Sequence, residues 1–302
     1  MPVLSPFSSS GHFFKGNIHA HTNRSDGALP PAETVRHYKA AGYDFVAITD
    51  HYNESFGCPV TDTRAFRDES FTTILGAELH VPRSEGKLPW HLVGVGLPLD
   101  FPPPCNEEDG PALAKRAREA GAFVGMAHPS WYQLSLAEGE SVAPYAHAVE
   151  IYNHGCQIIH DKGDGAYMLD GLSDRGCRLL TYACDDAHFR QPDFGHGWVE
   201  VKAGERSPEA LLAALKAGHY YSSQGPELFS VVIENDGVTV ECSPAESVIA
   251  VGCGKLYSVC FDAGITRCTL SMDGVRQSPW LRIVVTDQKG RRAWTNPHWL
   301  AG

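Results

Sequence analysis

Histidine and acidic residues gather in short segments of this sequence, close to the ends of predicted strands. His19 and His21 are two positions apart in HAHTNRSDG, which also contains Asp26. Side chains two positions apart on a strand point to the same face, so both imidazoles can face one site. Imidazole and carboxylate are common ligands of divalent transition metals. The 15 histidines of the chain already favour a metalloprotein.

The same residue types recur further along the chain: His51 in AITDH, Glu78 in LGAEL, His91 in WHLVGVG, His128 in GMAHP, and Asp186 and His188 in ACDDAH. Each segment alone is weak evidence, because a pair of histidines also occurs on solvent-facing strands. Together, unpaired acids and histidines crowded into one space would carry a large desolvation cost, which bound cations offset. The segments therefore predict a multinuclear metal site.

Residues 16–223 alternate short apolar runs with amphipathic stretches, which predicts repeated strand–helix units. Strands are expected at 17–21, 44–49, 73–79, 91–97, 122–127, 148–152, 178–183 and 197–201. Helices are expected at 31–42, 110–121, 165–176 and 207–218. Short connections between such units favour a parallel sheet closed into a barrel. The carboxyl ends of barrel strands meet at one rim, where the ligand-type residues would converge.

After Pro226 the pattern changes to short apolar runs separated by turns such as Asn235-Asp236-Gly237. Strands are expected at 228–234, 238–242, 247–251, 255–261, 266–272 and 281–286. We therefore divide the chain into an α/β domain over residues 1–226 and a small all-β, β-sandwich-like C-terminal domain over residues 227–302.

Charge and cysteine content narrow the partners. The formal net charge of −11 argues against a nucleic-acid partner and against a polybasic membrane surface. No apolar run is long enough for a membrane span, and the N-terminus lacks the pattern of a secretory leader. The nine cysteines include no CxxC pair. These features predict a cytoplasmic protein that acts on a small molecule, and they leave a homo-oligomer open.

The motifs HAHTNRSDG, AITDH, GAEL with HLVGVG, MAHP and DDAH appear in the order typical of the PHP (polymerase and histidinol phosphatase) superfamily. Residues 13–225 resemble these metal-dependent phosphoesterases, and the resemblance implies a distorted (β/α)7 barrel. DDAHFRQPDFGHGW, HYYSSQGPE and RRAWTNPHW resemble a finer group, the CehA/McbA branch, which contains carbaryl-hydrolysing enzymes.

The resemblance implies two or three divalent metals, with Mn, Zn and Fe all compatible with the ligands. The first would be held by His19, His21, Glu78 and Asp186. Glu78 would bridge to a second, which His91 and His128 complete. A third would be held by Asp26, His51 and His188. Some branches have histidine in place of Asp26, so the occupancy of the third site stays open.

A metal-bridging hydroxide would be the nucleophile in such a site, so no serine or cysteine nucleophile is needed. Asp26 or His188 could protonate the leaving group, or both could be ligands only. Candidate substrate contacts are Arg190, Arg24, His196 and Tyr220. Glu150, in VEIYN, is either a group that orients a ligand histidine or a buried acid paired with an arginine.

Three functions remain open from sequence. The first is a phosphoesterase acting on a small anionic phosphomonoester or diester. The second is an aryl ester or carbamate hydrolase of the CehA/McbA type. The third is a non-catalytic PHP-fold binding or scaffold protein, which the complete ligand set disfavours.

Overall fold

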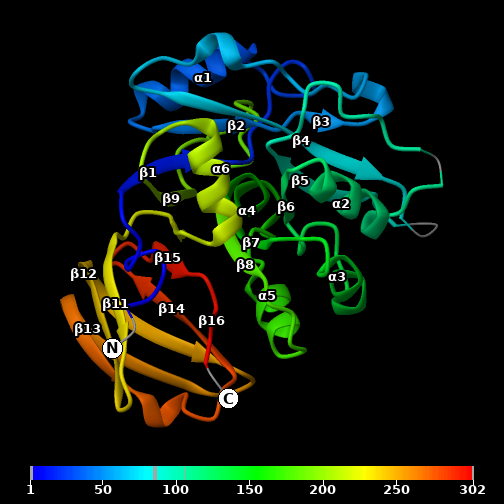
Figure 1. Cartoon of the computed structure of the whole chain (residues 1–302). Helices are drawn as coiled ribbons and strands as arrows, with labels where there is room; N and C mark the ends of the chain where they lie inside the picture. The colour runs from blue at the N-terminus through cyan, green and yellow to red at the C-terminus, as the bar shows by residue number, and fades with distance from the viewer. Residues whose placement is uncertain (1–2, 84–86, 106, 301–302) are drawn as a thin grey trace.

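The computed structural model describes residues 3–83, 87–105 and 107–300 and joins their strands into one extended sheet (Figure 1). Through residue 223 the strands are β1 (His12–Asn17), β2 (Phe45–Ile48), β3 (His51–Tyr52), β4 (Thr72–Val81), β5 (Trp90–Val95), β6 (Phe123–Met126), β7 (Ala148–Asn153), β8 (Leu180–Cys184), β9 (Trp198–Ala203) and β10 (Tyr220–Ser223). Their order in the sheet is β10-β9-β1-β2-β4-β5-β6-β7-β8, with β3 beside β4. The mixed α/β fold predicted from sequence is confirmed.

The run from β1 to β8 curves back on itself. Its two ends meet at a parallel bridge between Ala20, just after β1, and Ala187, just after β8. One apolar cluster takes buried side chains from strands around this run, including Phe45, Val93, Phe123 and Tyr182. Continuous apolar runs such as FVAI in β2 suit this position, since they are covered on both faces.

The expectation of a purely parallel sheet is wrong at β5 and β9. β1–β2, β2–β4, β6–β7 and β7–β8 are parallel, whereas β5 is antiparallel to β4 and β6, and β9 to β1 and β10. β4 ends at Val81 and β5 begins at Trp90, which leaves too few residues for a helical crossover. The start of β5 therefore lies beside the end of β4.

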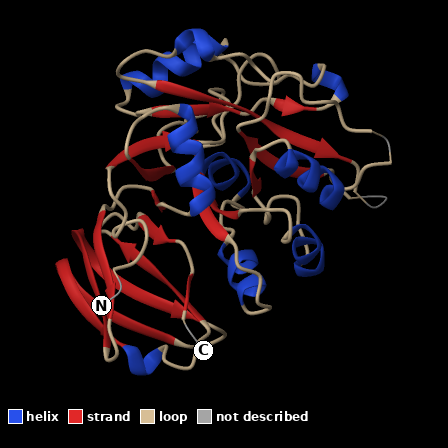
Figure 2. Ribbon diagram, viewed as in Figure 1, coloured by secondary structure: helices blue, strands red, loops and turns tan. Residues whose placement is uncertain are grey.

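Helices surround the strands (Figure 2), and α4 contributes residues to the cavity described below. They are α1 (Pro31–Ala40), α2 (Gly110–Glu119), α3 (Leu136–Val142), α4 (His154–His160), α5 (Ala166–Ser173) and α6 (Pro208–Ala217), with short 3-10 turns η1 (Glu54–Phe56) and η2 (Arg64–Phe66). In α6, which the sequence predicts at 207–218, the Ser207 side chain accepts from the Ala210 N–H and Gly218 takes a left-handed conformation. Sequence analysis missed α3 and α4.

Residues 228–299 contain strands and one 3-10 turn: β11 (Leu228–Ile233), β12 (Gly237–Gly252), β13 (Tyr257–Ser271), η3 (Met272–Gly274), β14 (Trp280–Thr286), β15 (Arg292–Thr295) and β16 (His298–Trp299). The predicted pairs of short strands at 238–251 and 255–272 are wrong, because each pair forms one long strand. Register shifts near Ala245 bend β12 and β13 without ending them, which is typical of β-bulges.

These strands are continuous with the first part of the sheet. β15 pairs with β10, so Tyr221 lies opposite Thr295. Trp294 is buried in the same apolar cluster as Leu92 and Met126. The segment after Pro226 thus covers the edge formed by β10 and contributes to the main core.

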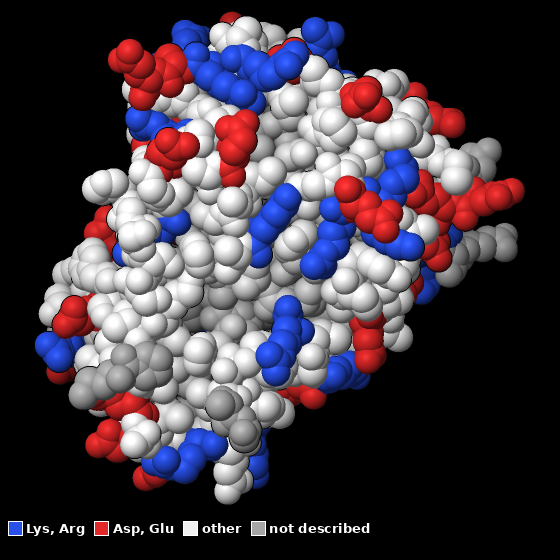
Figure 3. Space-filling model, viewed as in Figure 1, with Lys and Arg blue, Asp and Glu red and all other residues white. Residues whose placement is uncertain are grey.

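The face of the molecule in Figure 3 carries acidic and basic side chains in small separate groups rather than one continuous basic surface. This agrees with the acidic composition of the chain. Within the described residues, no helix is both long and apolar enough to cross a bilayer.

Asn296 ties the last strands to the rest of the fold. Its Oδ1 accepts from the Thr181 N–H at 2.8 Å, and its Nδ2 donates to the carbonyls of Gly218 and Tyr220 at 3.1 and 2.9 Å. Asn296→Ala leaves these buried groups unpaired, so we expect the free energy of unfolding to fall by about 2–3 kcal/mol. Urea unfolding followed by fluorescence measures this. Asn235→Ala, at an exposed turn, should change it by less than about 0.5 kcal/mol, and an equal loss in both variants would contradict the assignment.

Candidate metal centre

Glu78 lies at the centre of the histidine cluster and is completely buried near the end of β4. Its Oε1 is 2.7 Å from His91 Nδ1 and 2.9 Å from His128 Nε2. Its Oε2 is 3.7 Å from His19 Nε2 and 3.6 Å from His21 Nε2. The two carboxylate oxygens therefore face two different pairs of histidines, which is the arrangement of a bridging ligand.

Asp186 joins the pair formed by His19 and His21. Its Oδ1 is 3.2 Å from His19 Nε2 and 2.9 Å from His21 Nε2. The Asp186 backbone has φ 53°, an uncommon left-handed conformation for a non-glycine residue. The Asp186 N–H donates to the His19 carbonyl at 3.0 Å, which holds the two segments together.

The strand predicted at 17–21 is wrong, because β1 spans His12–Asn17 and only Asn17 belongs to both ranges. Beyond that point the backbone is held mainly by neighbouring segments. The His21 N–H donates to the Ala187 carbonyl at 2.9 Å, and the Ala20 N–H donates to Thr49 Oγ1 at 3.1 Å. The imidazoles of His19 and His21 still converge on Asp186, as the sequence predicts.

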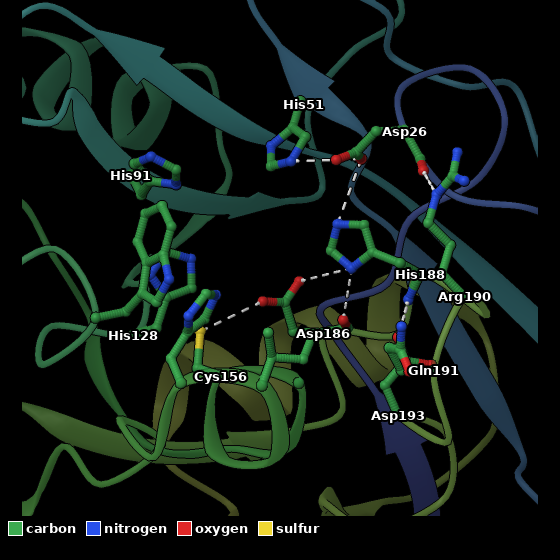
Figure 4. Close-up of a pocket in the computed structure, with 14 residues that line it drawn as sticks. Asp26, His51, His91, His128, Cys156, Asp186, His188, Arg190, Gln191 and Asp193 are labelled. Atoms are coloured by element: carbon green, nitrogen blue, oxygen red, sulfur yellow. Dashed lines mark hydrogen bonds and ion pairs between the residues drawn. The ribbon is translucent and has the colours of Figure 1, made fainter.

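A third group forms at the open side of the cluster (Figure 4). Asp26 Oδ1 is 3.5 Å from His51 Nε2 and 3.3 Å from His188 Nε2. His21 also contributes a ligand atom within 4.8 Å of the others. His188 Nδ1 lies 2.9 Å from the carbonyl of Asp186, which leaves Nε2 free to face Asp26.

Several side-chain atoms of the cluster lack a hydrogen-bond partner within the protein and are of the types that bind divalent cations. Buried atoms without a hydrogen bond of acceptable geometry include His19 Nε2, His21 Nε2, Glu78 Oε2 and Asp186 Oδ1. These nitrogen and oxygen atoms all face the same small space. Unpaired buried polar atoms are costly, and a transition metal with mixed nitrogen and oxygen ligands would satisfy all of them.

A cavity of about 380 Å³ opens onto this cluster. One side carries the ligand-type residues His51, His91, His128, Asp186 and His188. Other walls are formed by Trp131, by α4 residues and by the loop after His188, with Gly155, Cys156, Ile159, His160, Arg190, Gln191 and Asp193. The cluster is therefore accessible to a small molecule.

A model of the PHP domain matches residues 17–192, more than half of the chain. The chain belongs to the PHP domain family. A curated relative, the uncharacterized protein MJ1295 of Methanocaldococcus jannaschii, is 33% identical over 114 residues, which are 37% of this chain and 44% of the relative. This chain thus matches less than half the length of that relative.

Solved structures also resemble this PHP protein. A two-domain protein from Bacteroides vulgatus, which contains a predicted PHP-like metal-dependent phosphoesterase, matches with a TM-score of 0.55 and 16% identity, covering 98% of both chains. This supports the fold across both parts of the chain. A protein from Bifidobacterium adolescentis, proposed to be a metal-dependent phosphoesterase, has a TM-score of 0.44 and 14% identity, covering 57% of this chain and 87% of its own.

The charges in the PHP cluster stabilise one another. Burial would raise the pKa of Glu78, but the neighbouring imidazoles of His51, His91 and His80 outweigh it and hold the pKa well below its usual value. Burial and the nearby charges of His188 and His51 lower the pKa of His21 to about 4. Glu78 is therefore ionised and His21 neutral at pH 7, which are the forms that bind metals. At His51 and His188, burial is outweighed by the neighbouring carboxylates, which raise the pKa to about 10 and about 9, so these two histidines must lose a proton to bind a metal.

Glu150, on β7, orients the ligand residues from behind. Its Oε1 is 2.9 Å from His19 Nδ1 and accepts from Cys184 Sγ at 2.7 Å. Its Oε2 accepts from the His128 N–H at 2.5 Å and from Asn153 Nδ2 at 2.9 Å. Within the described chain no arginine pairs with Glu150, so the orienting role is the alternative that the geometry supports.

The predicted substrate contacts separate into two groups. Arg190 lines the cavity, and its Nε donates to the carbonyl of Asp26 at 2.6 Å. Arg24 lies instead in a different surface depression beside Pro30 and Asp62. His196 is exposed and stacks on His154, outside the residues that line the cavity.

The prediction that Tyr220 contacts the substrate is wrong. It is fully buried in the apolar cluster that contains Val201 and Leu215, so it cannot contact a substrate in the cavity. Its place is set by the pairing of β10 with β9, which the sequence pattern around HYYSS does not reveal.

Sequence analysis did not assign His80 or His160 to the site. His80 follows Glu78 by two positions and so faces the same side of β4, a signal that was available. His160 ends α4 and lines the cavity. Trp131 packs against His91 and His128, with ring centroids 5.3 and 5.2 Å apart.

Glu150→Gln tests the orienting role. An amide cannot accept at both oxygen positions, so either His19 or the His128 and Asn153 donors lose a partner. We expect metal affinity to fall about 10- to 100-fold while the protein stays folded. Competition with a chelator of known affinity measures this. Glu119→Gln, on the exposed end of α2, should leave the affinity unchanged; wild-type affinity in the Glu150 variant would show that the carboxylate does not orient the ligands.

Proposed function

We propose that this PHP protein is a metal-dependent hydrolase, and most specifically a phosphoesterase for a small phosphomonoester or diester. The observation that carries the proposal is the bridging position of Glu78 between two sets of histidines at the base of an open cavity. We further propose that β1–β9 form the distorted (β/α)7 barrel of the family, and that the chain belongs to its CehA/McbA branch.

The ligand sets that the family resemblance implies draw on residues that lie close together. His19, His21 and Asp186 would hold one metal, and His91 and His128 another, with Glu78 between them. Asp26, His51 and His188 would hold a third. Bound Mn, Zn or Fe would supply a hydroxide nucleophile at neutral pH and neutralise charge on the reacting group.

The chain's own residues would place the substrate. Asp26 and His188 line the cavity, where either could donate a proton to the leaving group. Arg190 carries a guanidinium at the same opening, and a guanidinium matches the geometry of phosphate oxygens. This cation favours a phosphate ester.

A second candidate, an aryl ester or carbamate hydrolase, is favoured by the opposite wall. Trp131, Ile159 and Cys156 give this wall an apolar surface. Ile159 is half exposed there, and a flat aromatic leaving group would cover it. Trp90 and Tyr132 are buried in the core and do not line the cavity.

The cysteines bear on the location of the protein. All nine are free thiols, and several are buried. Free thiols are typical of a reducing compartment, which supports the cytoplasmic location that we propose.

Arg190→Ala separates the two candidate reactions. The protein would be assayed with p-nitrophenyl phosphate, bis-p-nitrophenyl phosphate and a naphthyl carbamate, with added Mn²⁺ or Zn²⁺. A phosphoesterase should lose kcat/KM for the phosphate esters about 10- to 100-fold, since an ionic hydrogen bond is worth about 1.5–3 kcal/mol. Because Arg190 also donates to the Asp26 carbonyl, its loss could disturb that backbone, but such a disturbance affects all substrates and cancels in the ratio of their kcat/KM values. Gln191→Ala, on the same wall, is the control; an equal loss on all substrates would exclude a phosphate-specific role.

His128→Ala tests the metal dependence. We expect the wild-type protein to contain at least two equivalents of divalent transition metal, and the variant to lose about one equivalent together with turnover. Elemental analysis of protein purified in metal-supplemented medium measures this. An active, folded protein that contains no metal would overturn the proposed function.

A further inference from the structure

His80 is a buried histidine of the cluster that the ligand assignments leave without a role. It lies on β4, where its neighbour across the sheet is His91 of β5. Its Nε2 is 2.8 Å from His51 Nδ1 and 3.5 Å from Glu78 Oε2. Only about 9% of His80 is exposed, so its hydrogen-bond partners are protein groups rather than bulk water.

His51 uses its two ring nitrogens in different directions. Nε2 faces Asp26 in the third group of ligands, at 3.5 Å from Oδ1. Nδ1 faces two acceptors, Glu78 Oε2 at 2.6 Å and His80 Nε2 at 2.8 Å. A histidine that binds a metal through one nitrogen is normally fixed by a hydrogen bond from the other. One of these two acceptors must therefore orient His51.

Glu78 is poorly suited to that task once the centre is loaded. Its Oε1 faces His91 and His128, and its Oε2 belongs to the group formed with His19 and His21. A carboxylate engaged by cations through both oxygens is a weaker acceptor for a further donor. His80 Nε2 belongs to none of the ligand sets proposed above, although it lies within 4.8 Å of ligand atoms of His51 and Glu78. A neutral imidazole nitrogen can accept a hydrogen bond.

We propose that His80 is a positioning residue that accepts the Nδ1–H of His51 and so holds His51 Nε2 for the metal bound with Asp26 and His188. The inference rests on the proposed metal centre. It adds that one of the sites depends on a residue outside the ligand set. His80 itself touches neither the substrate nor this metal.

The proposal predicts a selective effect on one site. In His80→Leu the acceptor is lost and the volume is nearly kept, so the affinity of one class of metal site should fall about 10- to 100-fold. The sites that Glu78 bridges should keep their affinity. In His80→Gln the amide oxygen can accept from His51, so most of the lost affinity should return.

The experiment uses the full chain, stripped of metal and titrated with Zn²⁺ by calorimetry, with elemental analysis of each loaded variant. His154→Leu is the matched control, because His154 contacts Tyr152 and His196 and no proposed ligand. Thermal unfolding of the metal-free variants checks that each is folded.

Three binding equivalents in the wild type, with only the weakest class reduced in His80→Leu and restored in His80→Gln, would support the proposal. Equal weakening of all classes, no change in either variant, or only two equivalents in the wild type would overturn it. These results do not depend on turnover, so they are distinct from a failure to find hydrolysis. A wild type that binds no Zn²⁺ would overturn the metal centre itself.

Discussion

Glu78 and Asp186 are buried carboxylates surrounded by imidazoles, and the rest of the structure around the cavity is organised by the need to stabilise them. In the described chain, neither carboxylate pairs with a lysine or an arginine. Removing a carboxylate from water costs several kcal/mol unless charge and hydrogen bonds replace the lost hydration. Histidines alone replace it incompletely, since burial opposes their protonation and lowers the pKa of His21 and His91. Bound divalent cations would resolve this conflict.

Two other buried acids, Asp50 and Asp185, accept hydrogen bonds from the loops that carry or adjoin the ligands and so hold the crowded carboxylates and imidazoles in place. Asp50 accepts from the Thr22 N–H at 2.7 Å and from the hydroxyls of Ser25 and Thr61 at 2.9 and 2.6 Å, which fixes the loop before Asp26. Asp185 accepts from the backbone N–H groups of 195–197 and fixes the loop beyond Arg190. Asp50 and Asp185 each directly precede a proposed ligand. The ligand loops are thus anchored from inside the protein rather than by surface contacts.

Most of the candidate ligands could be predicted from sequence because each belongs to a local segment next to a strand. The strand run itself was also predictable, since its apolar segments are continuous and distinctive. The proximity of His80 to His51 depends on the antiparallel return of β5 and on β3 beside β4, and neither is encoded in a local pattern. Tyr220 was misplaced for the same reason, since sheet pairing decides which side of β10 faces the core. Arg24 is close to ligands in sequence, but its loop turns it toward another surface.

Anomalous X-ray diffraction from crystals loaded with Zn²⁺, measured on both sides of the zinc absorption edge, tests the central claim most directly. The account predicts at least two anomalous peaks with the Glu78 carboxylate between them, one beside His19, His21 and Asp186 and one beside His91 and His128. A folded protein with no anomalous peak within bonding distance of Glu78, and with the histidines hydrogen-bonded to the carboxylates instead, would contradict it.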